Sequence, residues 1–118
     1  MADLTTAPIE QLLDALKAAG VFASMDPAKV NLPGGWLALD EVRPHSLAGR
    51  LQLRCALYLI APDKDALRAV GVLTGLYNKA RTVLTPDGPV VTQGVVMPDS
   101  PTPLPALRVP VHLYTESE

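Results

Sequence analysis

The sequence predicts an α+β fold: a two-layer sandwich with a mostly antiparallel sheet of four or five strands and two helices packed on one face. Three observations support this. Residues 49–60 alternate between apolar and more polar side chains, as a strand with one buried face does. Two other segments, about 7–19 and about 63–82, repeat their apolar residues at helical spacing. The order of these segments, with further strands between and after them, favours helices that cover one sheet face.

The composition indicates one globular domain spanning residues 1–118. The chain is 48% hydrophobic and 19% charged, which is typical of a folded protein, and its net charge of -2 comes without a basic patch. Sequence-specific nucleic-acid binding is therefore not expected. A single cysteine excludes an internal disulfide framework and a cysteine zinc cluster. No secretory signal or membrane span is recognisable, so we expect a soluble protein made in a reducing cytoplasm.

The first helix is predicted at about 7–19, where Ile9, Leu12, Leu13 and Leu16 share one face and Gly20 is a plausible stop. Residues 21–24 fit a short strand or an extended segment, and residues 26–29 fit a turn or one loose helical turn. A turn at 31–35 then leads into a strand at 36–42. Adjacent residues of a regular strand face opposite sides, so Asp40 and Glu41 are not expected to act together.

The long strand at 49–60 organises the predicted sheet. Its apolar face carries leucines and one cysteine (Leu51, Leu53, Cys55, Leu57 and Leu59). The other face carries Arg50, Gln52, Arg54 and Tyr58, and this face is expected to meet water or a partner. The connection 43–49 before this strand predicts a hairpin with an extended tip.

The second helix is predicted from about Asp63 to Thr82, with Asp63 and Asp65 favouring its positive N-terminal end. Gly71 and Gly75 lie within it. They either allow close packing on the sheet or are tolerated in a helix that tertiary contacts hold. The apolar spacing does not distinguish these two interpretations.

The last third of the chain predicts two more strands, at 90–97 and 106–114. Gly94 suggests a bulge in the first of them. The proline-rich segment 98–105 between them reads as a stiff, polyproline-like connection. Pro110 removes one backbone donor, which predicts a sheet edge or a bulge at that point. Residues 115–118 form an acidic tail.

The residues predict no catalytic centre, metal site or cofactor site. Cys55 lies on the leucine face of its strand and reads as a small buried hydrophobic residue. His45 and His112 lack a third ligand at metal-binding spacing. Residues 33–35 lack the spacing and the Lys-Ser/Thr pair of a phosphate-binding loop. We therefore expect a protein that is not an enzyme.

The remaining signal points to protein contacts. Arginine and tyrosine are enriched in interfaces, and stiff loops that project from a sheet can reach a neighbour. A solvated sheet face explains any single one of these residues equally well. The candidate interface residues are Arg43, His45, Arg50, Gln52, Arg54, Tyr58, Pro101, Pro103, Arg108 and His112.

The layout resembles the small tail terminator proteins of long-tailed bacteriophages. The resemblance lies in the N-terminal amphipathic helix, residues 26–33 (DPAKVNLP), the strand that ends in residues 58–62 (YLIAP) with a helix after it, and residues 103–114 (PLPALRVPVHLY). It covers nearly the whole chain, and no single motif is diagnostic.

The resemblance implies a structural virion protein and no enzyme. It implies a homo-oligomeric ring, a hexamer in the family, that caps the tail tube, ends its polymerisation and joins the head-neck connector. The implied partners are other copies of the chain, the tube protein and the connector, with DNA passing through the ring. The implied location is the tail-neck junction of the virion, after assembly in the host cytoplasm.

Three alternatives stay open at this point. Two belong to the same assembly: a neck or head-closure protein, and a tail tube protein. The third belongs to another class, namely a small-ligand binding domain or an enzyme subunit whose site forms between copies. A deep apolar pocket with converging polar groups would favour the third.

Overall fold

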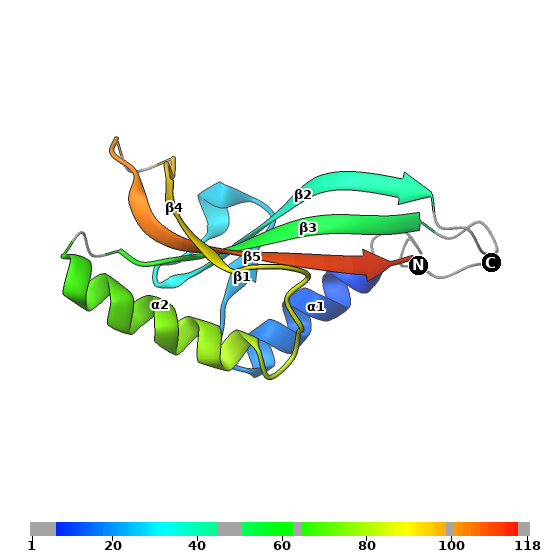
Figure 1. Cartoon of the computed structure of the whole chain (residues 1–118), viewed down its shortest axis with the longest axis horizontal. Coiled ribbons are helices and arrows are strands. Elements are labelled where there is room, and N and C mark those ends of the chain that lie inside the picture. Colours follow the sequence, from blue (N-terminus) through cyan, green and yellow to red (C-terminus); the bar gives the residue numbers. More distant parts are fainter. Residues whose placement is uncertain (1–6, 45–50, 63–64, 99–100, 116–118) are drawn as a thin grey trace.

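The computed structural model describes residues 7–44, 51–62, 65–98 and 101–115, and it confirms the α+β fold. Within these residues the chain forms two α-helices, a short 3-10 helix and five strands. The elements are α1 (Ala7–Ala18), β1 (Ala23–Ser24), η1 (Pro27–Lys29), β2 (Gly34–Pro44), β3 (Leu51–Ile60), α2 (Ala66–Ala80), β4 (Val91–Val95) and β5 (Leu104–Tyr114). Both α-helices lie on the same face of the sheet (Figure 1).

The strands form one sheet in the order β1-β2-β3-β5-β4. The pairs β2–β3, β3–β5 and β5–β4 are antiparallel, whereas β1 pairs with β2 in parallel at Gly35 and Trp36. The sheet is therefore mixed, although every long strand pair is antiparallel as predicted. The long strands β2, β3 and β5 run side by side along the molecule (Figure 1).

The main core lies between the sheet and the helices. The predicted apolar face of β3 is confirmed, because Leu53, Cys55, Leu57 and Leu59 are all at most 4% exposed. Leu12 and Leu16 of α1 and Leu73 and Leu76 of α2 pack into the same cluster. The leucines at helical spacing in α1 and α2 therefore pack against the alternating apolar residues of β3 in one layer.

The opposite face of the sheet is only partly open. Ile60, Val95, Met97, Leu104 and Ala106 form a second buried cluster there. Val30, Leu32, Trp36 and Tyr58 pack against this cluster, so the segment around η1 covers one end of that face. The expectation that the whole face meets water or a partner therefore holds only for its other end.

α2 begins at Ala66, with Asp65 as its N-cap. One Asp65 carboxylate oxygen accepts hydrogen bonds from the backbone N–H groups of Leu67 and Arg68. This confirms that the Asp65 carboxylate supports the N-terminal end of the helix. Asp63 lies outside the described residues. Gly71 and Gly75 have open space where a side chain would stand, which excludes the interpretation that they allow close packing on the sheet.

Two predictions about the last strands need correction. β4 pairs with β5 in continuous register through Gly94, so the predicted bulge at Gly94 is absent. Gly94 instead leaves room for Pro103, whose Cβ would stand 3.0 Å from a Cβ at this position. The predicted stiff connection is also shorter than expected, because Leu104 and Pro105 already belong to β5. A glycine that accommodates a proline gives the same sequence signal as a bulge.

Pro110 occupies an edge position of β5, as predicted, and causes no bulge. Its Cα partner on β3 is Ala56, in unbroken register, and β4 ends its pairing with β5 at Arg108. The Pro110 carbonyl accepts a hydrogen bond from the backbone N–H of Asp87 at 2.7 Å. Since the backbone nitrogen and carbonyl of a strand residue point to the same side, the missing donor faces away from β3. No ladder hydrogen bond to β3 is lost.

Candidate interaction surface

The predicted polar residues that the structure describes come together on three adjacent strands. Cross-strand pairs join Arg43 to Gln52, Arg54 to His112 and Tyr58 to Arg108. We call the set Arg43, Gln52, Arg54, Tyr58, Arg108 and His112, together with the acidic residues described below, the polar face. It lies on the side of the sheet opposite the helices. Tyr58 borders the second cluster, and the other residues lie toward the end that this cluster leaves open.

A bulge in β2 adds two acidic residues to this face. Leu39 pairs with Cys55 and Glu41 pairs with Arg54, so Asp40 is the extra residue in the β2 strand. The bulge brings Glu41 beside Arg54 instead of turning it toward the helices. The expectation that Asp40 and Glu41 face opposite sides is therefore wrong, because it assumed a regular strand. Two adjacent acids in the middle of a strand were the available signal for a bulge.

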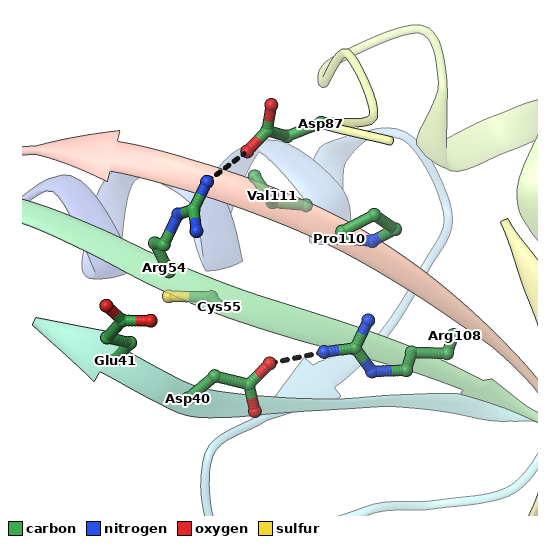
Figure 2. Close-up of a pocket in the computed structure, with 8 residues that line it drawn as sticks. All are labelled: Asp40, Glu41, Arg54, Cys55, Asp87, Arg108, Pro110 and Val111. Atoms are coloured by element: carbon green, nitrogen blue, oxygen red, sulfur yellow. Dashed lines mark hydrogen bonds and ion pairs between the residues drawn. The ribbon is translucent and has the colours of Figure 1, made fainter. Parts of the chain in front are cut away.

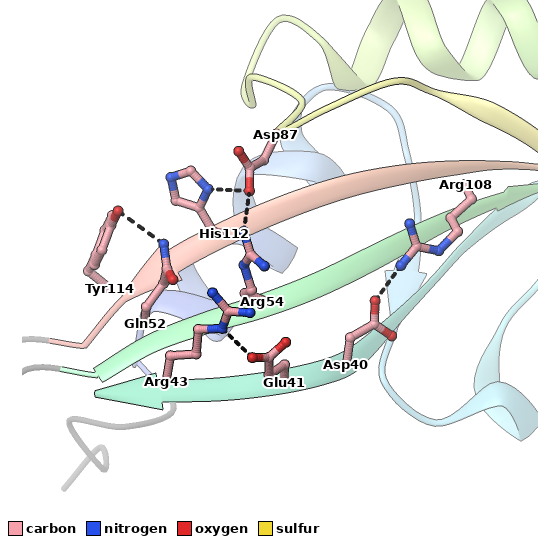
Figure 3. Close-up of polar contacts among 9 residues, drawn as sticks. All are labelled: Asp40, Glu41, Arg43, Gln52, Arg54, Asp87, Arg108, His112 and Tyr114. Atoms are coloured by element: carbon pink, nitrogen blue, oxygen red, sulfur yellow. Dashed lines mark hydrogen bonds and ion pairs between the residues drawn. The ribbon is translucent and has the colours of Figure 1, made fainter. Parts of the chain in front are cut away.

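Three ion pairs balance the arginines of the polar face (Figure 3). Arg108 lies 2.5 Å from Asp40, Arg54 lies 3.8 Å from Asp87, and Arg43 pairs with Glu41. Asp87 comes from the loop between α2 and β4. Its role could not be predicted from local spacing, because Asp87 lies more than twenty residues from Arg54 and His112, the residues it contacts. Each arginine of the polar face thus has an acidic partner.

His112 also contacts Asp87. Its Nδ1 lies 2.7 Å from the same Asp87 carboxylate oxygen that Arg54 approaches. This is a close contact between the imidazole and the carboxylate, and its angle is not that of a hydrogen bond. Together with the Asp87 N–H bond to Pro110, this contact holds the α2–β4 loop against β5.

The charges of the polar face stabilise one another. The contact with His112 first, and then the charge of Arg54, hold the pKa of Asp87 below its ordinary value. The hydrogen bond from Arg43 lowers the pKa of Glu41. Tyr58 first, and then Asp40, raise the pKa of Arg108. All of these shifts favour the charged forms at neutral pH, although the groups are exposed enough that solvent weakens each pair.

A shallow polar depression lies between these ion pairs. It is lined by Asp40, Glu41, Arg54, Cys55, Asp87, Arg108, Pro110 and Val111 (Figure 2). Its volume is about 260 Å³, which is below the roughly 300–1,000 Å³ of small-molecule sites, and such sites are mostly apolar. The arginines at its rim already face carboxylates. This geometry suits surface contact better than ligand capture.

The other predicted interface residues do not join the polar face. His45 and Arg50 lie outside the described residues. Pro101 and Pro103 are exposed, and Pro103 stands beside Gly94 where β4 and β5 meet. They belong to the opposite end of the sheet from the three ion pairs.

Exposed apolar side chains form a second kind of surface, which the sequence analysis did not identify. Leu67 and Val70 of α2 are 83% and 58% exposed, and Leu39 and Val42 of β2 are 44% and 48% exposed. Leu39 and Val42 pair with Cys55 and Leu53, so they lie on the helix side of the sheet, beyond the cover that the helices provide. Apolar periodicity predicts that these residues share a face with the core. It does not predict their exposure, because that depends on where the covering helix ends.

Comparisons of the chain with protein-family models, curated proteins and solved structures found no significant match. No helix in the described part of the chain is long and apolar enough to cross a membrane. Among the same residues, no group of three or more His, Cys, Asp or Glu side chains is placed to hold a metal ion.

Proposed function

We propose that this chain is a structural protein that assembles with copies of itself into a ring, and that the ring acts as a tail terminator of a long-tailed bacteriophage. The observation that carries the assembly proposal is the presence of exposed apolar residues on two different surfaces, α2 and the far half of β2. Uncovered apolar residues of this kind mark contact sites. Two unlike surfaces on one chain suit head-to-tail contacts, which close into rings.

The resemblance to tail terminator proteins in the order of elements and in several short sequence segments supports the terminator proposal. In this proposal the ring caps the tail tube, stops its growth and presents a surface to the head-neck connector. The polar face then serves as a contact surface for one of these partners, through Gln52, Arg54, Tyr58, Arg108 and His112. A self-neutralised set of ion pairs suits a surface that stays hydrated until a partner binds it.

The first experiment is the native mass of the purified full chain over a concentration series, measured by light scattering. We expect a discrete ring, and six copies is the number that the resemblance implies. A monomer at every concentration would contradict ring formation by the chain alone. The terminator role itself is tested by adding the protein to growing tail tubes: tubes of fixed length with protein at one end support it, and unaltered growth contradicts it.

A further inference from the structure

Three lysines that are far apart in the sequence come together where α1, α2 and η1 end. Lys17 lies in the last turn of α1, Lys79 in the last turn of α2, and Lys29 at the end of η1. Lys17 and Lys29 line the same hollow in the surface. The Lys79 side chain lies over Gly20, just after α1, with its Nζ 3.8 Å from where a Cβ of Gly20 would stand. The fold thus gathers positive charges that the sequence scatters.

None of these three lysines forms an ion pair with another residue that the structure describes. The arginines of the polar face differ, because each of them already has an acidic partner. Asp14 lines the same hollow as Lys17 and Lys29, but it approaches neither of them to ion-pair distance. The helix ends offset the lysine charges only in part, since a helix C-terminus carries about half an elementary negative charge. An anionic partner would therefore find uncompensated positive charge here.

Apolar side chains stand beside the lysines. Phe22 lines the hollow and is 58% exposed, and Met25, close behind it in the chain, is 40% exposed. The hollow has a volume of about 280 Å³, and Leu13 and Ala23 also line it. Exposed apolar residues surrounded by polar ones mark contact sites, and phenylalanine is enriched in interfaces. We call the three lysines together with Phe22 the lysine surface.

The chemistry of the lysine surface favours an acidic peptide over a nucleic acid. Duplex DNA carries about one negative charge per 1.7 Å of its axis and presents no apolar side chain. It would bring phosphates against Asp14 and Asp26, which stand among the lysines, and leave Phe22 without an apolar partner. A peptide can place carboxylates on the lysines, pass the two acids with uncharged residues, and seat an apolar side chain in the hollow. Such charge complementarity also steers a partner to its site.

We propose that the lysine surface binds an acidic segment of another protein, with carboxylates of the segment on the lysines and one of its apolar side chains in the hollow. This contact is separate from the polar face, whose charges are already paired within the chain. It also goes beyond the function proposed above, because neither ring formation nor tail termination requires it.

The test measures binding of a labelled synthetic peptide to the full chain by fluorescence polarisation. The probe peptide carries glutamates on both sides of a central leucine. One comparison peptide has glutamine in place of every glutamate, and another has serine in place of the leucine. We expect saturable binding of the probe, weaker binding of the serine peptide and no binding of the glutamine peptide. Raising the salt concentration should weaken probe binding, because exposed charge pairs are screened.

Charge-reversed variants locate the binding site. Lys17→Glu and Lys29→Glu each change an exposed side chain, so both should fold, which thermal melting checks. Arg68→Glu is the matched control, because it makes the same charge change at an exposed position near the other end of α2. We expect each lysine variant to bind the probe about fivefold more weakly, and Arg68→Glu to bind it like the unaltered chain. Phe22→Ser should weaken binding of the probe more than binding of the serine peptide.

Reversing the charges of both partners gives the decisive measurement. The double variant with Lys17→Glu and Lys29→Glu should bind a peptide that has lysine in place of every glutamate, whereas the unaltered chain should not. A loss of structure cannot produce this gain of binding. If the double variant fails to melt cooperatively, Lys17→Gln with Lys29→Gln replaces it, and the salt dependence of probe binding should then decrease.

Three results would overturn the proposal. The first is equal affinity of the unaltered chain and both single lysine variants for the probe. The second is equal binding of the probe and the glutamine peptide, because charge would then play no part. The third is duplex DNA that displaces the probe at an equal concentration of negative charge, which would favour a nucleic acid as the partner. The assay follows peptide binding and not native mass, so its result is independent of whether rings form.

Discussion

A single inserted residue shapes the polar face. Asp40 occupies the bulge of β2, and the bulge allows Asp40 to pair with Arg108 while Glu41 lies beside Arg54. In a regular strand without the bulge, Asp40 would pair with Arg54 and Glu41 would pair with Leu53 on the helix side. The residues after the bulge also change face, which places Val42 with Leu53 on the apolar side and Arg43 with Gln52 on the polar side.

The Cys55 thiol allows a prediction about pH. Burial, and secondarily the charge of Asp40, raise the pKa of Cys55 to about 11 from 9.0. Because the folded-state pKa is the higher one, the stabilising effect of the neutral thiol is full below pH 9 and is lost as pH rises toward 11. The free energy of unfolding should therefore fall by at most about 3 kcal/mol over this range, at roughly 1.4 kcal/mol per pKa unit.

The measurement is urea unfolding at several pH values between 9 and 11, with Cys55→Ala as the comparison. Cys55→Ala has no thiol, although it also loses some packing. The difference between the pH dependences of the two proteins therefore separates the contribution of Cys55 from that of other titrating groups. Equal pH slopes for the two proteins would contradict the prediction. A thiol reagent at pH 8 should also modify the native chain far more slowly than the urea-unfolded one, because the thiolate is the reactive form.

At the scale of elements, the two halves of α2 differ. The C-terminal half buries Leu73, Leu76 and Ala80, whereas in the N-terminal half Ala69 is the buried residue and Leu67 and Val70 are exposed. The C-terminal half of α2 therefore contributes more to the core than its N-terminal half. Its two inner glycines have no packing role within the described chain, since nothing lies within 4 Å of the Cβ that either would carry.

Gly71→Ala and Gly75→Ala should each stabilise the monomer by about 1 kcal/mol, because alanine is the better helix former and each new methyl group meets open space. Gly34→Ala is the contrasting variant, since its Cβ would stand 2.4 Å from the Asn31 carbonyl oxygen. It should destabilise the fold. Urea unfolding at concentrations where the chain is monomeric measures all three. A loss of stability in Gly75→Ala would show that the helix packs more tightly there than the structure indicates.

At the scale of the whole molecule, β2 and β3 extend beyond the end of α1 (Figure 1). The chain measures 48 × 26 × 24 Å, and both helices lie below the sheet (Figure 1). Its apolar contact residues stand at the two edges, whereas its ion pairs are concentrated on the polar face. In the proposed ring, the exposed apolar residues would contact other copies of the chain and the polar face would contact another protein.

This division predicts how assembly responds to salt. Contacts made by apolar side chains are not screened, so the ring should persist between about 0.1 and about 1 M sodium chloride, where the Debye length falls from about 10 to about 3 Å. Binding of a tube or connector protein through the polar face should weaken over the same range. Light scattering at each salt concentration tests the first part, and dissociation of the ring at high salt would indicate that ion pairs hold the copies together.

The fold class, the two helices and the buried face of β3 could all be predicted from the sequence. These follow from local periodicity, because a repeat of 2 or 3.6 residues fixes which side chains share a face. Three features could not be predicted in this way: the bulge at Asp40, the contacts of Asp87 with Arg54 and His112, and the exposure of Leu39, Val42, Leu67 and Val70. Each depends on register or on where a covering element ends, and both are set by contacts between segments distant in the chain.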